Sequence, residues 1–210
     1  MLVLFPKKSP RHAKQQGFTL IELLVVIAIV LILAGITFGI SRGVQNAQAR
    51  AKAKGELALM TQGLEQFKST YGDYPWIGET ADDTANASNL LRALTGWAIL
   101  EKNAAGNVSM QAVPANEGPK KSFVDASKLS LSGDFPATGA PAASVYLLDP
   151  WGNQYAYIYR TDAGGNWDNF GYVLFSEGSD GNSATVPNNG IIDQTWRDRP
   201  QNIDNIYGGE

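Results

Sequence analysis

The sequence predicts an α+β fold in which one long N-terminal α-helix packs on a small C-terminal antiparallel β-sheet, with a loop-rich insertion between them. Three observations predict it: an apolar run over residues 18–40, apolar residues at helical spacing up to residue 71, and alternating aromatic residues after residue 154. We expect four parts: a basic leader at 1–17, the long helix at 18–71, a loop-rich variable segment at 72–144, and the sheet with a C-terminal loop at 145–210.

The apolar run from Phe18 to Ile40 is long enough to span a membrane. Its 23 residues rise roughly 34 Å as a helix, against a hydrocarbon core about 30 Å thick. Glu22 is its only charged residue. A carboxylate in lipid costs on the order of 3 kcal/mol, so we expect a functional role and a partner for Glu22; the alternative is a snorkelling side chain without a role.

The preceding segment, 1–17, is basic: it has Lys7, Lys8, Arg11 and Lys14 and no acidic residue. An ordinary secretory signal has an apolar core of roughly 7–15 residues followed by a small-x-small cleavage site. This core is longer and no such site follows it. The sharp junction instead lies before the core, after residue 17.

The string Gly17-Phe18-Thr19-Leu20-Ile21-Glu22 resembles the class III leader of type IV pilins and type II secretion pseudopilins. The resemblance implies a pilin-like fold, cleavage after Gly17 and methylation of Phe18 by a prepilin peptidase. It also implies a single-pass inner-membrane protein with a periplasmic C-terminal domain, assembled into a periplasmic or cell-surface filament. The implied partners are further copies of the chain, secretion or pilus platform proteins and minor pseudopilins.

The same resemblance gives Glu22 a partner. Cleavage creates an ammonium group on Phe18, which Glu22 of a neighbouring subunit can meet among the packed helices. An ion pair in a low-dielectric bundle adds little net stability, but either charge left alone there costs far more, so the pair would set the register between subunits.

Composition excludes several classes of chemistry. The chain has no cysteine, and its only histidine, His12, lies in the leader. The mature chain would therefore lack His-based triads, His or Cys zinc sites and thiol nucleophiles. Removing four of the 17 basic residues leaves 13 against 20 acidic ones, a net charge of −7 in place of −3, which argues against a nucleic-acid partner. We predict no enzyme, no catalytic residue and no cofactor other than calcium, although carboxylate or Ser/Lys chemistry is not excluded.

The long helix is expected to continue to Tyr71, where Gly72 and Pro75 end it. Its apolar stripe covers one face and predicts core packing; the stripe consists of Leu57, Met60, Leu64, Phe67 and Tyr71. The helix end, Tyr71 to Pro75, also resembles that of G-type major pseudopilins.

Small residues recur at every fourth position of this helix: Gly35, Gly39, Gly43, Ala47, Ala51 and Gly55. Such a stripe allows close approach of helices during assembly, and each Gly weakens the helix by roughly 1 kcal/mol relative to Ala. The resemblance implies a Pro at the position of Gly39 in many family members, so the absence of Pro here leaves a kink unassured. The three glycines from Gly35 to Gly43 make this stretch the place where we expect the helix to stretch or unwind in a filament. The alternative is that these are incidental small residues facing lipid.

In the middle segment, a short helix is predicted from Ser88 to residue 102, and the rest of 76–144 is predicted as loop. This segment resembles an insertion relative to compact G-type pseudopilins. It is either a partner surface or a variable loop.

The C-terminal sheet is predicted from two β-rich runs, Gln154 to Thr161 and Phe170 to Ser176, joined by a hairpin loop over 162–167. A short ordered run at 145–148 precedes them, followed by a turn at Asp149-Pro150-Trp151-Gly152-Asn153. This string resembles the sheet of G-type pseudopilins. The alternating Tyr155, Tyr157 and Tyr159 are interpreted as core.

The segment after the sheet offers oxygen ligands at Glu177, Asp180, Asn182 and Asp193. The resemblance implies a calcium site in this loop, and irregular loops suit calcium. We predict Asp180 and Asp193 as calcium ligands; the alternative is a solvated acidic turn.

Three classes of function follow. The first is a structural subunit of a type II secretion pseudopilus, a filament that helps drive protein secretion. The second is a major or minor pilin of a surface type IV pilus, used in adhesion, motility or DNA uptake. The third, a membrane-anchored enzyme or ligand-binding domain, is disfavoured because the mature chain lacks His and Cys.

Overall fold

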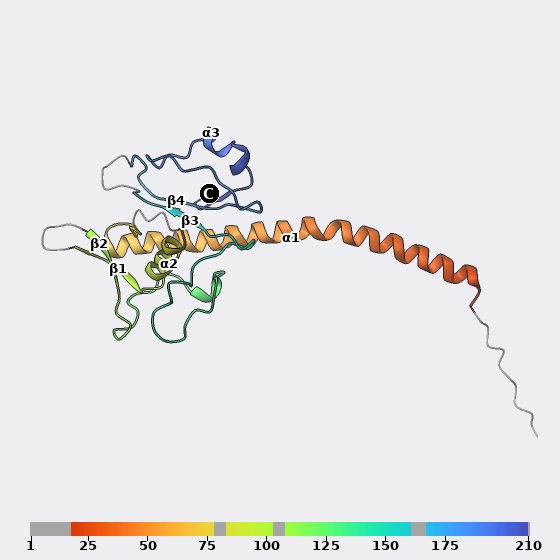
Figure 1. The fold of residues 1–210 in the computed structure, drawn as a ribbon, viewed down its shortest axis with the longest axis horizontal. Coiled ribbons are helices and arrows are strands. Elements are labelled where there is room, and N and C mark those ends of the chain that lie inside the picture. The colour runs from red at the N-terminus through yellow and green to blue at the C-terminus, as the bar shows by residue number, and fades with distance from the viewer. Residues whose placement is uncertain (1–17, 78–82, 103–107, 161–166, 210) are drawn as a thin grey trace, which may run out of the picture. The chain divides into compact units, whose positions relative to one another are not determined.

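The computed structural model of the protein describes residues 18–77, 83–102, 108–160 and 167–209, and only the backbone at 36–42 and 83–85. The chain divides into two compact units, Met1–Val44 and Gln45–Glu210, which we describe separately; Figure 1 shows the order of the elements. The predicted leader 1–17, with its Gly17, and residues 162–166 of the predicted hairpin loop lie outside the described residues.

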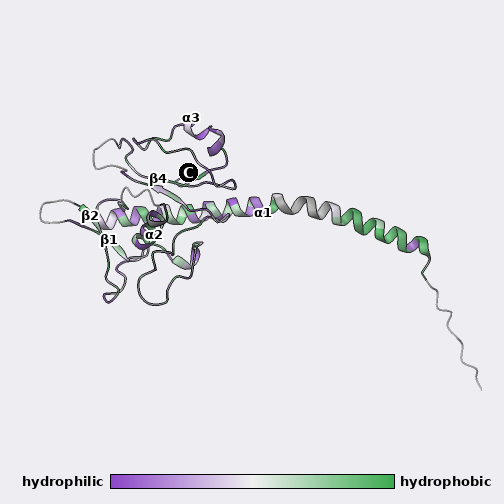
Figure 2. Cartoon of the chain, in the orientation of Figure 1, coloured by the Kyte–Doolittle hydropathy of each residue, from purple (hydrophilic) through white to green (hydrophobic). Residues whose placement is uncertain are grey.

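Helix α1, Leu20–Tyr71, has 52 residues and confirms the predicted long helix, which begins two residues later than expected. In the first unit its side chains are strongly apolar (Figure 2). A search of the described residues nevertheless finds no helix that is long and apolar enough to cross a membrane. Of the predicted span 18–40, the side chains of 36–40 lie outside the described part.

At its other end, α1 stops at Gly72 as predicted. Gly72 has a φ of +90°, in the left-handed region that favours glycine. Its N–H donates to the carbonyl of Lys68 at 2.7 Å, so one of the last helical carbonyls gains a partner.

The core of the second unit lies along one face of α1. The predicted stripe is confirmed, because Leu57, Met60, Leu64 and Phe67 are fully buried or nearly so and Tyr71 is half-buried. The main cluster adds Leu90, Leu91 and Leu94 from α2, Leu147, Leu174, and the three alternating tyrosines. A smaller cluster surrounds Phe67, whose ring lies 5.4 Å from that of Phe123. The prediction that Tyr155, Tyr157 and Tyr159 belong to the core is confirmed.

Helix α2, Asp83–Leu94, begins and ends earlier than predicted, so Ser88 lies inside the helix and not at its N-terminus. The expectation of helix up to residue 102 was wrong because Gly96 stops it. The Trp97 N–H donates to Arg92 O at 2.7 Å and the Gly96 N–H to Ala93 O at 3.3 Å, the pair of bonds that defines a Schellman motif. Gly96 has a φ of +82°, and a Cβ there would lie 2.9 Å from two backbone oxygens of the 120–121 segment.

The chain beyond Gly96 forms an antiparallel pair of strands where the end of the helix and then loop were expected. Strand β1, Ala98–Lys102, pairs antiparallel with β2, Val108–Ala112, with Leu100 opposite Met110. The predictions of helix over 98–102 and of loop over 108–112 were therefore wrong. A short 3₁₀ helix, η1, Ala126–Lys128, follows.

The C-terminal sheet has three antiparallel strands in the order β3-β4-β5. Strands β3, Ala156–Ile158, and β4, Val173–Ser176, confirm the two predicted runs in shortened form. Helix α3, Gln194–Arg197, the 3₁₀ helix η2, Pro200–Asn202, and strand β5, Ile206–Tyr207, occupy the segment expected to be loop. The run at 145–148 makes only two isolated bridges.

The predicted turn at 149–153 is present and is built around a buried carboxylate. Asp149 Oδ1 accepts from Trp151 N at 3.0 Å and from Asn153 N at 2.8 Å. Asp149 Oδ2 accepts from the Ser176 hydroxyl at 2.7 Å. The turn is thereby joined to the end of β4.

A second buried carboxylate joins α1 to distant parts of the chain. Glu56 is 3% exposed, and its Oε1 accepts from Ser130 N at 3.0 Å and from the Ser130 hydroxyl at 2.8 Å. Its Oε2 accepts from the Tyr155 hydroxyl at 2.7 Å. Burial and this bond to Glu56 raise the pKa of Tyr155 above its usual range, so Tyr155 remains a donor.

Replacing Glu56 with alanine is expected to destabilise the Gln45–Glu210 unit by about 3 kcal/mol, because donors on two segments lose their acceptor. Denaturant unfolding of the full chain in detergent measures this. The control is Lys52→Ala: Lys52 lies 3.8 Å from Glu56, but its side chain is 59% exposed, so we expect a loss below about 0.5 kcal/mol. Equal losses in the two variants would contradict the assignment.

Two glycines of α1 are expected to respond oppositely to alanine. A Cβ on Gly63 would lie 2.6 Å from Val124 Cγ1, whereas one on Gly55 would meet no atom within 4 Å. Gly63→Ala should therefore lower stability by about 1–3 kcal/mol through overpacking. Gly55→Ala should raise it by up to about 1 kcal/mol through helix propensity. Thermal melts of the two variants test this, and shifts of the same sign would refute it.

Candidate functional site at the start of helix α1

The first turn of α1 is closed by a reciprocal pair of side chains. Glu22 Oε2 accepts from both Thr19 N and the Thr19 hydroxyl, each at 2.8 Å. In return, Glu22 N donates to Thr19 Oγ1 at 3.3 Å. Thr19-Leu20-Ile21-Glu22 is thus a capping box, in which the threonine and the glutamate satisfy backbone N–H groups that the helix leaves unpaired.

This arrangement places the carboxylate beside the junction that the sequence marks for cleavage. Glu22 Oε2 binds the backbone nitrogen that directly follows Phe18, the residue that cleavage would make N-terminal. Phe18 is exposed, and Gly17 lies outside the described residues. No bond to Glu22 Oε1 occurs among the described residues, so this oxygen is free to accept from a further donor.

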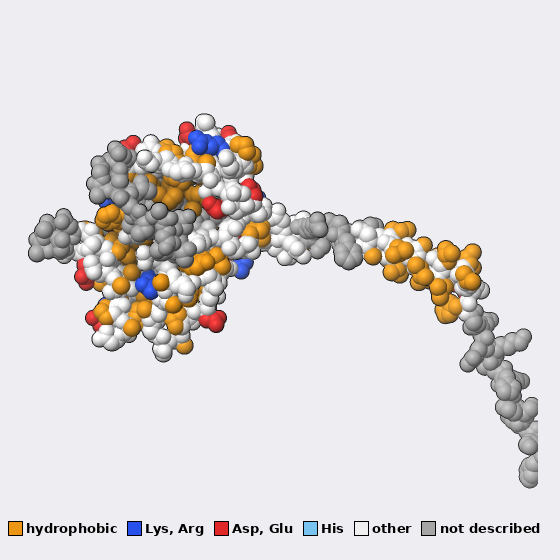
Figure 3. All heavy atoms as spheres, in the orientation of Figure 1, with side chains coloured by type: hydrophobic (Ala, Val, Ile, Leu, Met, Phe, Trp, Pro, Cys, Tyr) orange, Lys and Arg blue, Asp and Glu red, His pale blue; other side chains and the backbone are white. Residues whose placement is uncertain are grey.

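The helix that follows the capping box presents apolar side chains on all sides. Leu20 is 85% exposed, and Ile21, Leu31 and Ile32 are each more than 60% exposed. Figure 3 shows this hydrophobic surface on the described part of the first unit. Continuous exposed apolar surface of this kind marks a segment that is covered in the working assembly, by lipid or by protein.

The stripe of small residues is exposed at each position whose burial is described. A Cβ on Gly35, Gly43 or Gly55 would meet nothing within 4 Å, and Ala47 and Ala51 are exposed. Gly39 is one of the residues of which only the backbone is described. The predicted role of the stripe in helix association stays a prediction, and the stripe is accessible where it is described.

The two predicted calcium ligands have separate hydrogen-bonding roles. Asp180 Oδ1 accepts from Asn182 N at 2.9 Å, and Asp193 Oδ1 caps α3 by accepting from Trp196 N at 2.8 Å. No group of three or more His, Cys, Asp or Glu residues is positioned to hold a metal in the described ranges. Calcium takes six to eight oxygen ligands, so this geometry does not support the site, and calcium binding stays a prediction.

A carboxylate that sequence reasoning did not consider organises this loop. Asp204 Oδ2 accepts from Ser179 N at 2.7 Å, from the Ser179 hydroxyl at 3.0 Å and from Asp180 N at 3.2 Å. Asp204 lies far along the chain in a segment without β or helical periodicity, so no local signal identifies it.

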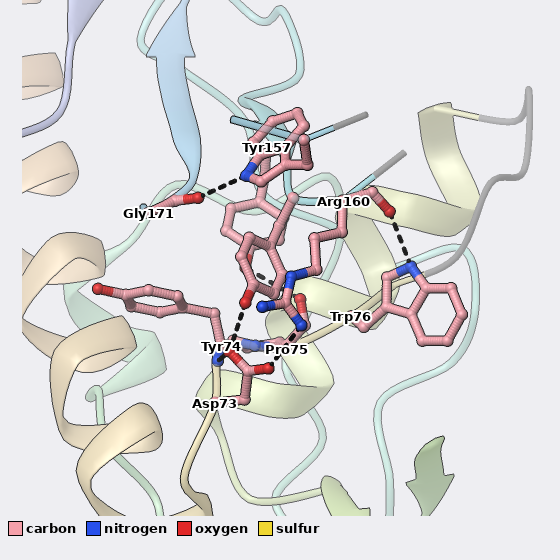
Figure 4. Close-up of polar contacts among 9 residues, drawn as sticks. Asp73, Tyr74, Pro75, Trp76, Tyr157, Arg160 and Gly171 are labelled. Carbon is pink, nitrogen blue, oxygen red and sulfur yellow. Dashed lines mark hydrogen bonds and ion pairs between the residues drawn. The ribbon is translucent and has the colours of Figure 1, made fainter. Parts of the chain in front are cut away.

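Sequence reasoning also missed a polar cluster that joins the end of α1 to the end of β3 (Figure 4). Asp73 accepts from the Tyr159 hydroxyl and pairs with Arg160, whose Nη1 lies 3.1 Å from Asp73 Oδ2. Trp76 Nε1 donates to the carbonyl of Arg160 at 3.1 Å. Burial and the bond to Asp73 raise the pKa of Tyr159. The cluster holds Arg160 at a φ of +49° and has a structural role.

Comparison with known proteins identifies the segment that contains the capping box. Residues 12–38 match the model of the prokaryotic N-terminal methylation motif. No significant match was found among curated proteins or among solved structures. The match covers the predicted cleavage junction, the capping box and the exposed apolar turns of α1. The chain therefore carries at its N-terminus the methylation motif that is the signature of type IV pilins and pseudopilins.

Proposed function

We propose that this protein is a structural subunit of a type II secretion pseudopilus. The N-terminal methylation motif at 12–38 carries the proposal. According to this proposal, a prepilin peptidase cleaves after Gly17 and methylates Phe18. The apolar part of α1 then holds the subunit in the inner membrane, and copies assemble through α1 into a periplasmic filament. The exposed apolar side chains from Leu20 onward support the proposal, because lipid in the membrane and other copies of the helix in a filament would cover them.

The capping box supports a specific role for Glu22 in assembly. Its Oε2 is bound to Thr19 of its own chain, which fixes the direction of the carboxylate and leaves Oε1 for the Phe18 amine of a neighbouring copy. Such a pair in a low-dielectric bundle gives specificity of register more than stability, since an unpaired charge there is strongly unfavourable.

The choice of a secretion filament rests on two strings that resemble G-type pseudopilins. Tyr71 to Pro75 ends α1 at a left-handed glycine, and Asp149 to Asn153 forms a turn with a buried carboxylate. Both strings thus have defined structural roles in the Gln45–Glu210 unit. The β1–β2 pair lies in the segment that resembles an insertion, and for this reason a major or minor pilin of a surface type IV pilus is the second candidate.

Deletion of the gene in its native host tests the choice. For a secretion pseudopilus, we expect exported proteins to accumulate in the periplasm and to reappear in the medium when the wild-type gene is restored. Normal secretion combined with loss of surface filaments, adhesion or twitching would refute the secretion role in favour of the surface pilus.

The Glu22 carboxylate is expected to be required for assembly but not for processing. Glu22→Ala and Glu22→Gln should both be inserted and cleaved at wild-type levels, yet yield at least tenfold less filament in sheared or cross-linked membrane fractions. Glu22→Gln is the stricter variant, because it keeps a side chain of the same length and removes only the charge. Normal filament yield from either variant would contradict the ion-pair role.

A further inference from the structure

A small cavity lies between α1 and β5 in the Gln45–Glu210 unit. Its volume is about 210 Å³, and it is lined on one side by Arg50 and Lys54 of α1 and on the other by Asn205, Ile206 and Tyr207. Three features of this lining point to a missing partner: a buried acceptor and two cations that have no partner among the described residues, and a sheet edge.

The first feature is the amide of Asn205, which is 6% exposed and whose Oδ1 has no hydrogen-bond partner in the part of the chain that the structure describes. The neighbouring Asn202 fixes its orientation. Asn202 Oδ1 accepts from Ala184 N at 2.7 Å and Asn202 Nδ2 donates to Trp196 O at 2.5 Å, so Asn202 presents an oxygen to Asn205. Asn205 Nδ2 donates to that oxygen at 3.4 Å. The unpaired atom is therefore an acceptor, and it requires an N–H or O–H donor.

The second feature is a pair of cations. Arg50 and Lys54 are four residues apart, and like charges at this spacing on a helix repel each other. Among the described residues, the three ion pairs use Lys52, Lys120 and Arg160, and neither Arg50 nor Lys54 has an acidic partner. An anion in the cavity would be attracted by both.

The third feature is the position of β5. It is the last strand in the order β3-β4-β5, and its residues Ile206 and Tyr207 line the cavity. A terminal strand has one side without a paired strand, and such an edge accepts an extended peptide through main-chain hydrogen bonds.

We propose that this cavity docks an extended acidic segment of a second copy of the chain. Such a segment supplies a carboxylate to Arg50 and Lys54 and a backbone N–H to Asn205 Oδ1. A free carboxylate supplies no donor and would leave Asn205 unpaired. The chain itself is acidic, with 20 acidic against 17 basic residues, and exposed acids such as Glu117 and Asp134 lie in loops. The proposal rests on the proposed function, because the filament holds copies side by side at high effective concentration.

Cross-linking of the full chain in its own membrane tests the partner. Because the sequence has no cysteine, Ala58→Cys places a single thiol at the cavity lining, to be labelled with a photoreactive maleimide. We expect a cross-linked dimer of the chain, with the second site mapped to an acidic loop. Ser69→Cys, also exposed on α1 but outside the cavity lining, is the matched control and should give at least tenfold less dimer. A product with lipid or another protein, or equal dimer from both positions, would overturn the proposal.

Charge reversal provides the second arm. Arg50→Glu/Lys54→Glu should lower filament yield at least tenfold with unchanged processing and unchanged protease resistance of the Gln45–Glu210 unit. Lys102→Glu/Lys128→Glu makes the same change in net charge at exposed residues elsewhere and should leave filament yield unchanged. Normal filaments from the Arg50/Lys54 variant would refute the docking site alone. The proposed function would be refuted if the wild-type strain formed no filaments and deletion of the gene caused no secretion defect.

Discussion

The buried carboxylate of Glu56 is the interaction on which the second unit depends most. It receives hydrogen bonds from Ser130 and from Tyr155, residues 74 and 99 positions further along the chain. The segment around Ser130 and the residue directly before β3 are thereby fixed to one position on α1. A buried charge with incomplete partners is strongly unfavourable, so these segments cannot shift without a large loss of free energy. Tyr155 directly precedes β3, which pairs with β4, so the bond from Tyr155 to Glu56 also joins α1 to the sheet.

Helix α1 carries two carboxylates that have very different surroundings. Both carboxylate oxygens of Glu56 accept hydrogen bonds from other residues of the same chain, Ser130 and Tyr155. Glu22 is bound by Thr19 through one oxygen only, and the apolar side chains around it are exposed. The first is a completed structural site. The second has the features of an interface that only another molecule completes, which is consistent with the methylation motif at 12–38.

Features that depend on residues close together in the sequence were mostly predicted correctly, whereas features that depend on distant residues were not. The end of α1 at Gly72, the buried face of α1 and the turn at Asp149 were all predicted, because each depends on residues within one or two turns of chain. The helix predicted to continue to residue 102 is an exception, because its end also has a local signal in the sequence. Gly96 occupies the glycine position of a Schellman motif. Strand β5 and Asp204 had no such signal. Their partners, Phe175 and Ser179, lie 32 and 25 residues away in the chain.

Residue types and spacing were enough to predict the core face of α1, the end of α1 at Gly72 and the α+β class, because helical periodicity and helix termination are properties of neighbouring residues. The capping box of Thr19 and Glu22 is equally local in the sequence but was not predicted. The assignment of the remaining carboxylates required the folded chain. Asp193 caps α3, Asp204 binds the 179–180 segment, and Glu56 joins α1 to Tyr155. A carboxylate accepts from any donor within reach, and the donors within reach are determined only when distant segments pack together.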